Sequence, residues 1–220
     1  MKKSLLVIAS LIGFSQAQQF EVVAQYGVGI RNAESASTNE SAKEVRNRMN
    51  KGLSFGTSGY YLLKDGKVGV GLNVLHYTAN NVDEDFDNVP GMMYDKVHYK
   101  ANESVLFVGP TFMQRSGTFE SAVRFFYQVG LGYTQITGDV ETSVGTDGAK
   151  ASIDESTLGF QLGAGMDIAI THGVSLTVNT NYLAATKDAA NIKLSTGQSI
   201  EEKDYPMGFI NVLAGLKYQF

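Results

Sequence analysis

The feature that most constrains how this chain folds is an alternation of apolar residues with small or polar ones, which recurs in eight segments. The segments cover about residues 20–31, 52–64, 67–78, 103–114, 123–134, 158–168, 174–182 and 210–220. Because successive side chains of a β-strand point to opposite faces, each segment predicts a strand with one apolar face. Residues 103–114 are apolar at both parities, so the pattern leaves the facing of that strand open.

The connections between these segments alternate between tight and long. Residues 64–67, 116–118 and 171–173 are typical of short hairpin turns, whereas residues 32–50, 79–102, 138–155 and 185–206 are long, polar and charged. Transmembrane β-barrels show this asymmetry, with short periplasmic turns and longer extracellular loops. The face opposite the apolar residues holds glycine and amide side chains rather than the Lys and Glu of a soluble sheet, as expected inside a narrow barrel.

A sheet built from these strands has to close on itself if its apolar face meets hydrocarbon. An unpaired strand edge there leaves backbone groups unsatisfied, at a cost of several kcal/mol each. An even number of strands lets the first and the last pair antiparallel, and eight strands leave an interior that side chains fill. We therefore predict an all-β protein, a closed eight-stranded antiparallel transmembrane up-and-down β-barrel. A soluble exported barrel that binds an apolar ligand is the alternative.

The N-terminus predicts export. Residues 1–3 are Met-Lys-Lys, residues 5–14 are apolar, and residues 15–17, Ser-Gln-Ala, place small residues where a signal peptidase cuts. We expect residues 1–17 to be a signal peptide and residues 18–220 to be an outer-membrane barrel domain. Without Lys2 and Lys3 the formal charge falls from −4 to about −6, which disfavours nucleic acid as a partner. The absence of cysteine excludes an acylated cysteine, disulfides and thiolate metal sites.

Two segments resemble strands of known families. Residues 215–220, Gly-Leu-Lys-Tyr-Gln-Phe, look like the terminal strand of outer-membrane barrels, and residues 107–112, Phe-Val-Gly-Pro-Thr-Phe, resemble another strand pattern common in them. In plan, the chain after residue 17 is similar to the transmembrane domain of outer-membrane protein A and to the OmpX/Ail family. The resemblance implies the cell outer membrane of a Gram-negative bacterium, and Tyr218 and Phe220 as the signal for the barrel-assembly machinery. No catalytic motif comes with it.

Few charged residues fall on the inward-facing parity, namely Glu21, Arg31, Arg124, Asp167 and Lys217. Glu21 begins the first strand and Lys217 nearly ends the last, so closure brings both to the periplasmic end. Arg124 and Asp167 lie at similar distances from the middle of their connection, so symmetric pairing sets them on facing residues. Because buried charges must be paired to offset desolvation, we interpret them as a structural plug, and Arg124→Ala is then expected to cost about 3–5 kcal/mol. A charged constriction of a channel is the alternative.

No set of residues predicts a catalytic or metal site. The nearest match to the His-x-Ser of a lipid A deacylase is residues 76–78, His-Tyr-Thr, with threonine at the serine position. His98 and His172 lie in a long connection and in a turn. Residues 83–88 begin like a calcium loop, but lack its sixth-position glycine and twelfth-position glutamate, so we interpret them as a solvated acidic loop. We expect no enzymatic activity, no cofactor and no metal.

The alternation and the resemblance together predict a rigid outer-membrane barrel with a structural role. We expect its four long extracellular loops to carry surface interactions, by adhesion or binding. The expected partners are outer-membrane lipid and lipopolysaccharide, the barrel-assembly machinery and an extracellular ligand of the loops, and we expect a monomer. A narrow porin-like channel for small or apolar solutes is the alternative, and a lipid-modifying barrel enzyme is a less favoured one.

Overall fold

Antiparallel β-strands make up nearly all of the described part of the chain. The computed structural model describes residues 20–31, 47–63, 66–87, 96–117, 121–144, 147–185, 189–194, 199–203 and 208–220, so the predicted signal peptide lies outside it. The strands in these residues are β1 (Phe20–Arg31), β2 (Lys51–Leu63), β3 (Val68–Ala79), β4 (Val82–Asp87), β5 (Lys96–Arg115), β6 (Val123–Val144), β7 (Asp147–Thr171), β8 (Val174–Ala185), β9 (Ala189–Leu194), β10 (Ser199–Lys203) and β11 (Gly208–Gln219). No helix among the described residues is long and apolar enough to cross a membrane.

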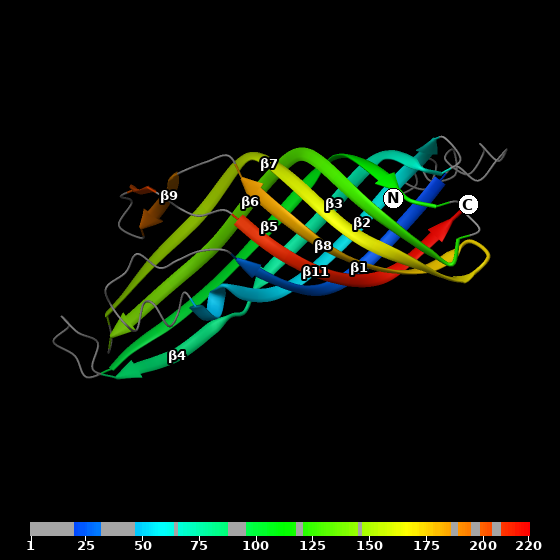
Figure 1. Ribbon diagram of the computed structural model, residues 1–220. Coiled ribbons are helices and arrows are strands. Elements are labelled where there is room, and N and C mark those ends of the chain that lie inside the picture. Colours follow the sequence, from blue (N-terminus) through cyan, green and yellow to red (C-terminus); the bar gives the residue numbers. More distant parts are fainter. Residues whose placement is uncertain are drawn as a thin grey trace, which may run out of the picture.

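Eight of these strands pair side by side into a ring, in the order β1-β2-β3-β5-β6-β7-β8-β11 and back to β1 (Figure 1). We call these eight the wall strands. The ring is joined between β1 and β11, where Glu21 lies opposite Gln219 and Arg31 opposite Phe209. Each wall strand therefore has an antiparallel neighbour on both sides, which satisfies the backbone hydrogen bonds of the wall. The eight predicted segments all fall on wall strands.

The two faces of the ring differ as the alternation predicts. Apolar side chains cover the outer face, and Tyr26 and Leu216 are each 57% exposed there. A soluble monomer rarely exposes so continuous an apolar surface. Strand β5, whose facing the sequence leaves open, turns Val105 and Phe107 inward and Phe112 outward. The inner face of the ring is thus part apolar as well as part polar.

Three glycines with a positive φ lie in the connections at one end of the ring. Gly66, Gly117 and Gly173 have φ angles of 78°, 79° and 82°. Glycine adopts this left-handed region without the steric cost that other residues meet. The predicted short connections at residues 64–67 and 171–173 are confirmed by the strand bounds on either side. The connection between β5 and β6 runs from residue 116 to residue 122, so it is longer than the tight turn predicted at 116–118.

Strands β5, β6 and β7 are much longer than the other wall strands, with 20, 22 and 25 residues against 12 or 13. They continue past the ring at the end opposite the turns, where β4 pairs with β5, β9 with β7, and β10 with β9 (Figure 1). We call this part the extended sheet. Residues 79–102, 138–155 and 185–206 are predicted as loops, and that prediction is wrong where these strands run. Adjacent antiparallel strands keep exchanging backbone hydrogen bonds beyond the wall, whatever the polarity of their side chains.

Candidate functional site

Two carboxylates and two cations meet inside the ring near its short-turn end. Arg115 Nη2 lies 2.5 Å from Glu21 Oε2, and Lys217 Nζ lies 2.9 Å from Glu21 Oε1. Lys217 Nζ also lies 2.7 Å from Asp167 Oδ2, and Arg115 Nε lies 3.8 Å from the same oxygen. We call these four residues the charge cluster, and their formal charges cancel. The contact between Glu21 and Lys217 is the one that closure of the ring implies.

The charge cluster is surrounded by apolar side chains. Lys217 Nζ lies 4.8 Å from the centre of the Phe126 ring, and Arg115 donates to Met113 Sδ at 3.7 Å. All four charged side chains are 2% exposed or less. A charge without a partner is costly in such surroundings, so each member of the charge cluster depends on the others. The buried apolar residues here are Val23, Tyr60, Leu62, Met113 and Phe126.

Arg124 does not join the charge cluster. It lies opposite Asp167 in the β6–β7 register, as symmetric pairing predicts. Its guanidinium, however, donates to Ser175 Oγ at 2.9 Å. The structure thus differs from the predicted ion pair between Arg124 and Asp167. The physical reason is that Lys217 and Arg115 reach the Asp167 carboxylate from β11 and β5.

A second buried ion pair lies farther along the interior. Arg31 Nη1 donates to both carboxylate oxygens of Glu103, at 2.8 and 2.6 Å, and the Arg31 guanidinium lies 5.7 Å from the centre of the Phe209 ring. The sequence predicts Arg31 to face inward but does not identify Glu103 or Arg115. Both missed residues lie on β5, where apolar side chains at both parities hide the facing. One signal in the sequence could have found Glu103. Arg31 has the inward parity, and a buried guanidinium needs a carboxylate partner on another inward-facing position.

Amide side chains occupy the middle of the interior and bond to one another. Successive donors and acceptors in this network lie 2.6–3.1 Å apart. Tyr60 donates to Gln128 at 2.8 Å and links the network to the apolar residues around the charge cluster. A cavity of about 10 Å³ lined by Gln25, Gln128 and Lys217 has room for about one water. The members of the amide network are Gln25, Asn73, Gln128, Gln161, Asn179 and Asn181.

Apolar side chains fill the interior between the amide network and the extended sheet. Tyr77, which has the inward parity, is buried among them and donates to the Met49 carbonyl at 3.0 Å. Its neighbours His76 and Thr78 are exposed on the outer face. The three residues that resemble a deacylase motif therefore do not face one common site. The buried apolar residues here include Leu75, Phe107, Ile136, Leu183, Phe209 and Leu213.

Three acidic residues of β4, namely Asp83, Glu84 and Asp85, lie against basic side chains in the extended sheet. The two ring nitrogens of His98 lie 3.1 Å from Asp83 Oδ1 and 2.8 Å from Asp85 Oδ1. Glu84, on the other face of β4, is paired with Arg48. Within the described residues, no group of three or more His, Cys, Asp or Glu side chains is arranged to hold a metal ion. The end of the calcium-like stretch lies outside the described residues.

The C-terminal aromatic residues lie on the outer face at the short-turn end. The rings of Tyr218 and Phe220 meet edge to face with their centres 4.6 Å apart. The Phe220 backbone nitrogen donates to the Phe20 carbonyl at 2.9 Å, which joins the end of the chain to β1. Their role as an assembly signal stays a prediction.

A ring of eight antiparallel strands, apolar outside and with buried charge pairs, amides and apolar side chains inside, defines an outer-membrane β-barrel protein. The chain belongs to the family of the outer membrane protein beta-barrel domain, whose model matches residues 4–220. Its location is the cell outer membrane. In barrels of this kind short turns are usually periplasmic and longer connections extracellular.

Solved structures of bacterial outer-membrane proteins share this fold. A major outer membrane protein from Thermus thermophilus matches with a TM-score of 0.59 and 13% identity, over 93% of this chain and 100% of that one. The outer membrane protein OprG from Pseudomonas aeruginosa matches with 0.55 and 16%, over 93% and 97%. Neisserial surface protein A matches with 0.52 and 15%, over 91% and 97%. No curated protein matches the chain.

Proposed function

We propose that the ring is a closed transmembrane barrel that does not conduct, and that it anchors the extended sheet at the cell surface to bind an extracellular partner. The observation that carries this proposal is the contrast between two regions of the molecule. Side chains that bond to one another fill the interior, whereas β5, β6 and β7 continue well past the wall. A rigid scaffold that displays long hairpins is suited to recognition.

The interior supports a barrel that does not conduct. The charge cluster, the amide network and the apolar residues near the extended sheet follow one another along the ring. Passage of a hydrated ion requires Glu21 to separate from Arg115 and Lys217, although all three side chains are almost fully buried. Separation of such a pair leaves uncompensated charges, at a cost of about 3–5 kcal/mol.

The extended sheet supports a role in binding at the surface. Among the described residues, β4 pairs with β5 alone and β10 with β9 alone. Each of these two strands therefore presents one backbone edge on which an extended segment of a partner protein can add a strand. Backbone hydrogen bonds supply affinity in that mode, and side chains on alternate positions supply specificity.

Conductance in planar bilayers tests the filled interior. The protein is purified in its folded, heat-modifiable form and added to a bilayer, and its insertion is confirmed by recovery with the lipid. We expect no steady single-channel currents, because an ion would have to separate the buried pairs that Glu21 makes with Arg115 and Lys217. Stable currents of uniform size would overturn the proposal in favour of the narrow porin-like channel.

Truncation of the β6–β7 hairpin tests the surface role. Val140 and Ala151 are register partners, so replacement of residues 141–150 by a two-residue Asn-Gly turn closes the hairpin without a change in the wall. We expect the free energy of unfolding to stay within about 1 kcal/mol of the original. Cells that display the truncated protein are expected to lose binding to at least one ligand, from a panel of purified matrix proteins and polysaccharides, that the full chain binds.

The panel distinguishes a binding protein from a purely structural one. If the full chain binds no member, the surface role is contradicted. If the truncated protein keeps every ligand, the end of the β6–β7 hairpin is not the binding element, and the free edges of β4 and β10 remain. Truncated protein that has lost heat-modifiable mobility is excluded from the comparison, because its wall has not folded.

We also propose that the barrel has no enzymatic role. Support comes from the placement of His76 and Thr78 on the lipid-facing surface, while Tyr77 between them is buried in the interior. A comparison of lipid A acyl chains in cells with and without the protein tests this. A change in acyl-chain number or length would identify a lipid-modifying enzyme instead.

A further inference from the structure

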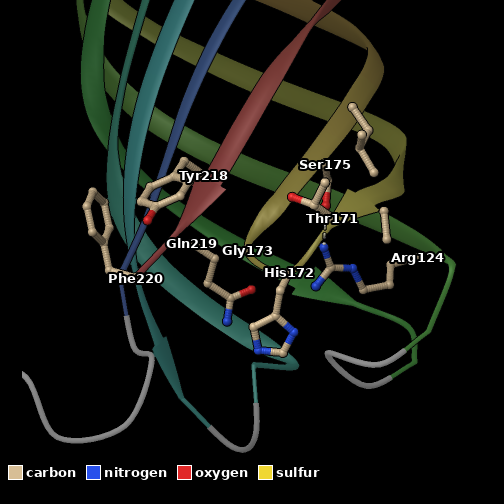
Figure 2. A pocket seen from close by; sticks show the side chains of 10 residues that line it. Arg124, Thr171, His172, Gly173, Ser175, Tyr218, Gln219 and Phe220 are labelled. Carbon is tan, nitrogen blue, oxygen red and sulfur yellow. Dashed lines mark hydrogen bonds between the residues drawn. The ribbon is translucent and has the colours of Figure 1, made fainter.

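A pocket of about 510 Å³ opens at the periplasmic end of the barrel (Figure 2). It lies where the interior meets the lipid-facing surface, because its lining comes from both faces of the wall. The turn between β7 and β8 contributes His172, which is exposed. The inner-face residues of the pocket are Arg124, Ser175 and Gln219, and the outer-face residues are Ile170, Tyr218 and Phe220.

Arg124 brings a positive charge to this pocket that the described residues do not neutralise. Its side chain is 4% exposed, its guanidinium donates to Ser175 Oγ at 2.9 Å, and its Nε has no partner. The nearest carboxylates of the interior, Glu21 and Asp167, are both bonded to Lys217. A buried guanidinium with an N–H still open is a strong donor for an oxyanion.

The outer half of the pocket has the opposite chemistry. Tyr218 and Phe220 are 48% and 56% exposed and stand at the periplasmic rim, where a barrel meets the lipid headgroups. Figure 2 shows these two rings on one side of the group of lining residues and Arg124 on the other, with His172 and Gln219 between them. A ligand that satisfies both halves has an anionic group joined to an apolar body.

We propose that this pocket binds the headgroup of an anionic phospholipid from the periplasmic leaflet of the outer membrane. The Arg124 guanidinium and the Ser175 hydroxyl face the phosphate oxygens, since guanidinium and phosphate form strong charge-assisted hydrogen bonds. Tyr218 and Phe220 pack against the glycerol and the first carbons of the acyl chains. Free phosphate shares the oxyanion chemistry but leaves the apolar half of the pocket empty.

Native mass spectrometry of the protein extracted in mild detergent tests the site with two probes, phosphatidylglycerol and phosphatidylcholine. We expect the anionic lipid to be retained about tenfold better than the zwitterionic one, and Arg124→Gln to remove that preference. Lys67→Gln is the matched control, because Lys67 is an exposed cation in the β2–β3 turn at the same end of the barrel. Heat-modifiable mobility confirms that each variant is folded.

A second pair of variants keeps the test independent of Arg124. His172 lies in an exposed turn, so His172→Glu and His172→Gln leave the wall unchanged. The glutamate places a carboxylate in the pocket and is expected to abolish the preference, whereas the glutamine is expected to keep most of it. Equal retention of the two lipids by the original protein would overturn the proposal. So would a loss of the preference for phosphatidylglycerol that is as large in Lys67→Gln as in Arg124→Gln. Displacement of the lipid by millimolar inorganic phosphate at matched ionic strength would assign the site to a soluble anion and overturn the lipid.

Discussion

At the scale of single residues, the interior is held by carboxylates that share their cations. Glu21 forms an ion pair with Arg115 through one carboxylate oxygen and with Lys217 through the other. Asp167 also forms an ion pair with Lys217. Loss of one member therefore leaves a net charge among apolar side chains. Arg124 lies close to the charge cluster but outside it, with a hydroxyl as its partner.

Two matched substitutions separate these roles. Arg115→Met removes a cation from the charge cluster but keeps a long apolar side chain, and we expect the free energy of unfolding to fall by about 3–5 kcal/mol. Arg124→Met removes a hydrogen bond to Ser175 but also a buried cation that has no ion pair among the described residues, so we expect a loss of about 1 kcal/mol or less. This value replaces the larger one expected from an ion pair with Asp167. Urea-induced unfolding in phospholipid vesicles measures both, and losses of equal size would contradict the charge cluster.

At the scale of the strand, the wall depends on close backbone approach at some glycines and not at others. A Cβ on Gly27 of β1 would lie 1.9 Å from the Val212 carbonyl oxygen of β11. A Cβ on Gly59 of β2 would meet nothing within 4 Å. Neither glycine has a positive φ, so the difference between them is one of space and not of backbone conformation.

Alanine at these two positions tests the seam between β1 and β11. Gly27→Ala forces the strands apart, and we expect the free energy of unfolding to fall by about 1–3 kcal/mol. Gly59→Ala adds a methyl group in open space and reduces the freedom of the unfolded chain, so an increase of about 0.4–1 kcal/mol is expected. The same unfolding experiment serves for both. A Gly27→Ala protein as stable as Gly59→Ala would show that the seam is not tightly packed.

At the scale of the whole molecule, closure of the ring brings the two ends of the barrel domain together. Phe220 lies beside Phe20 on the outer face, bonded to it through its backbone nitrogen. Because Phe220 is 56% exposed and its ring contacts the exposed ring of Tyr218, it adds little to the packing of the interior. A role in assembly, as the resemblance implies, leaves folded stability nearly independent of this residue.

Deletion of Phe220 distinguishes assembly from stability. We expect the amount of protein in the outer membrane to fall in cells, because the assembly machinery no longer meets the terminal aromatic residue. Protein refolded from urea into detergent is expected to keep a free energy of unfolding within about 1 kcal/mol of the full chain. Immunoblots of membrane fractions and unfolding curves measure the two effects. A parallel loss in both experiments would assign Phe220 a structural role.

The strands and their facing follow from local patterns. Residues 20–31 alternate strictly, and β1 has the expected apolar outer face. The tight turns are visible because each contains a glycine whose positive φ other residues rarely adopt. The facing of β5 was not visible, because its apolar residues occupy both parities. The extended sheet was missed because its polar side chains obscure the period-two pattern, although the backbone pairing continues.

Of the ion pairs inside the barrel, one was predicted from the sequence and the others were seen only in the structure. Glu21 and Lys217 were paired from the sequence alone, because closure of an even-stranded ring makes β1 and β11 antiparallel neighbours and brings the start of β1 beside the end of β11. Asp167 lies on β7, and its cations come from β5 and β11, which are not its neighbours in the ring. Contacts across the interior depend on the tilt and stagger of the strands and on the reach of long side chains. The alternation of residues along one strand does not determine this tilt and stagger. They are set by the tertiary structure, when the strands close into a ring.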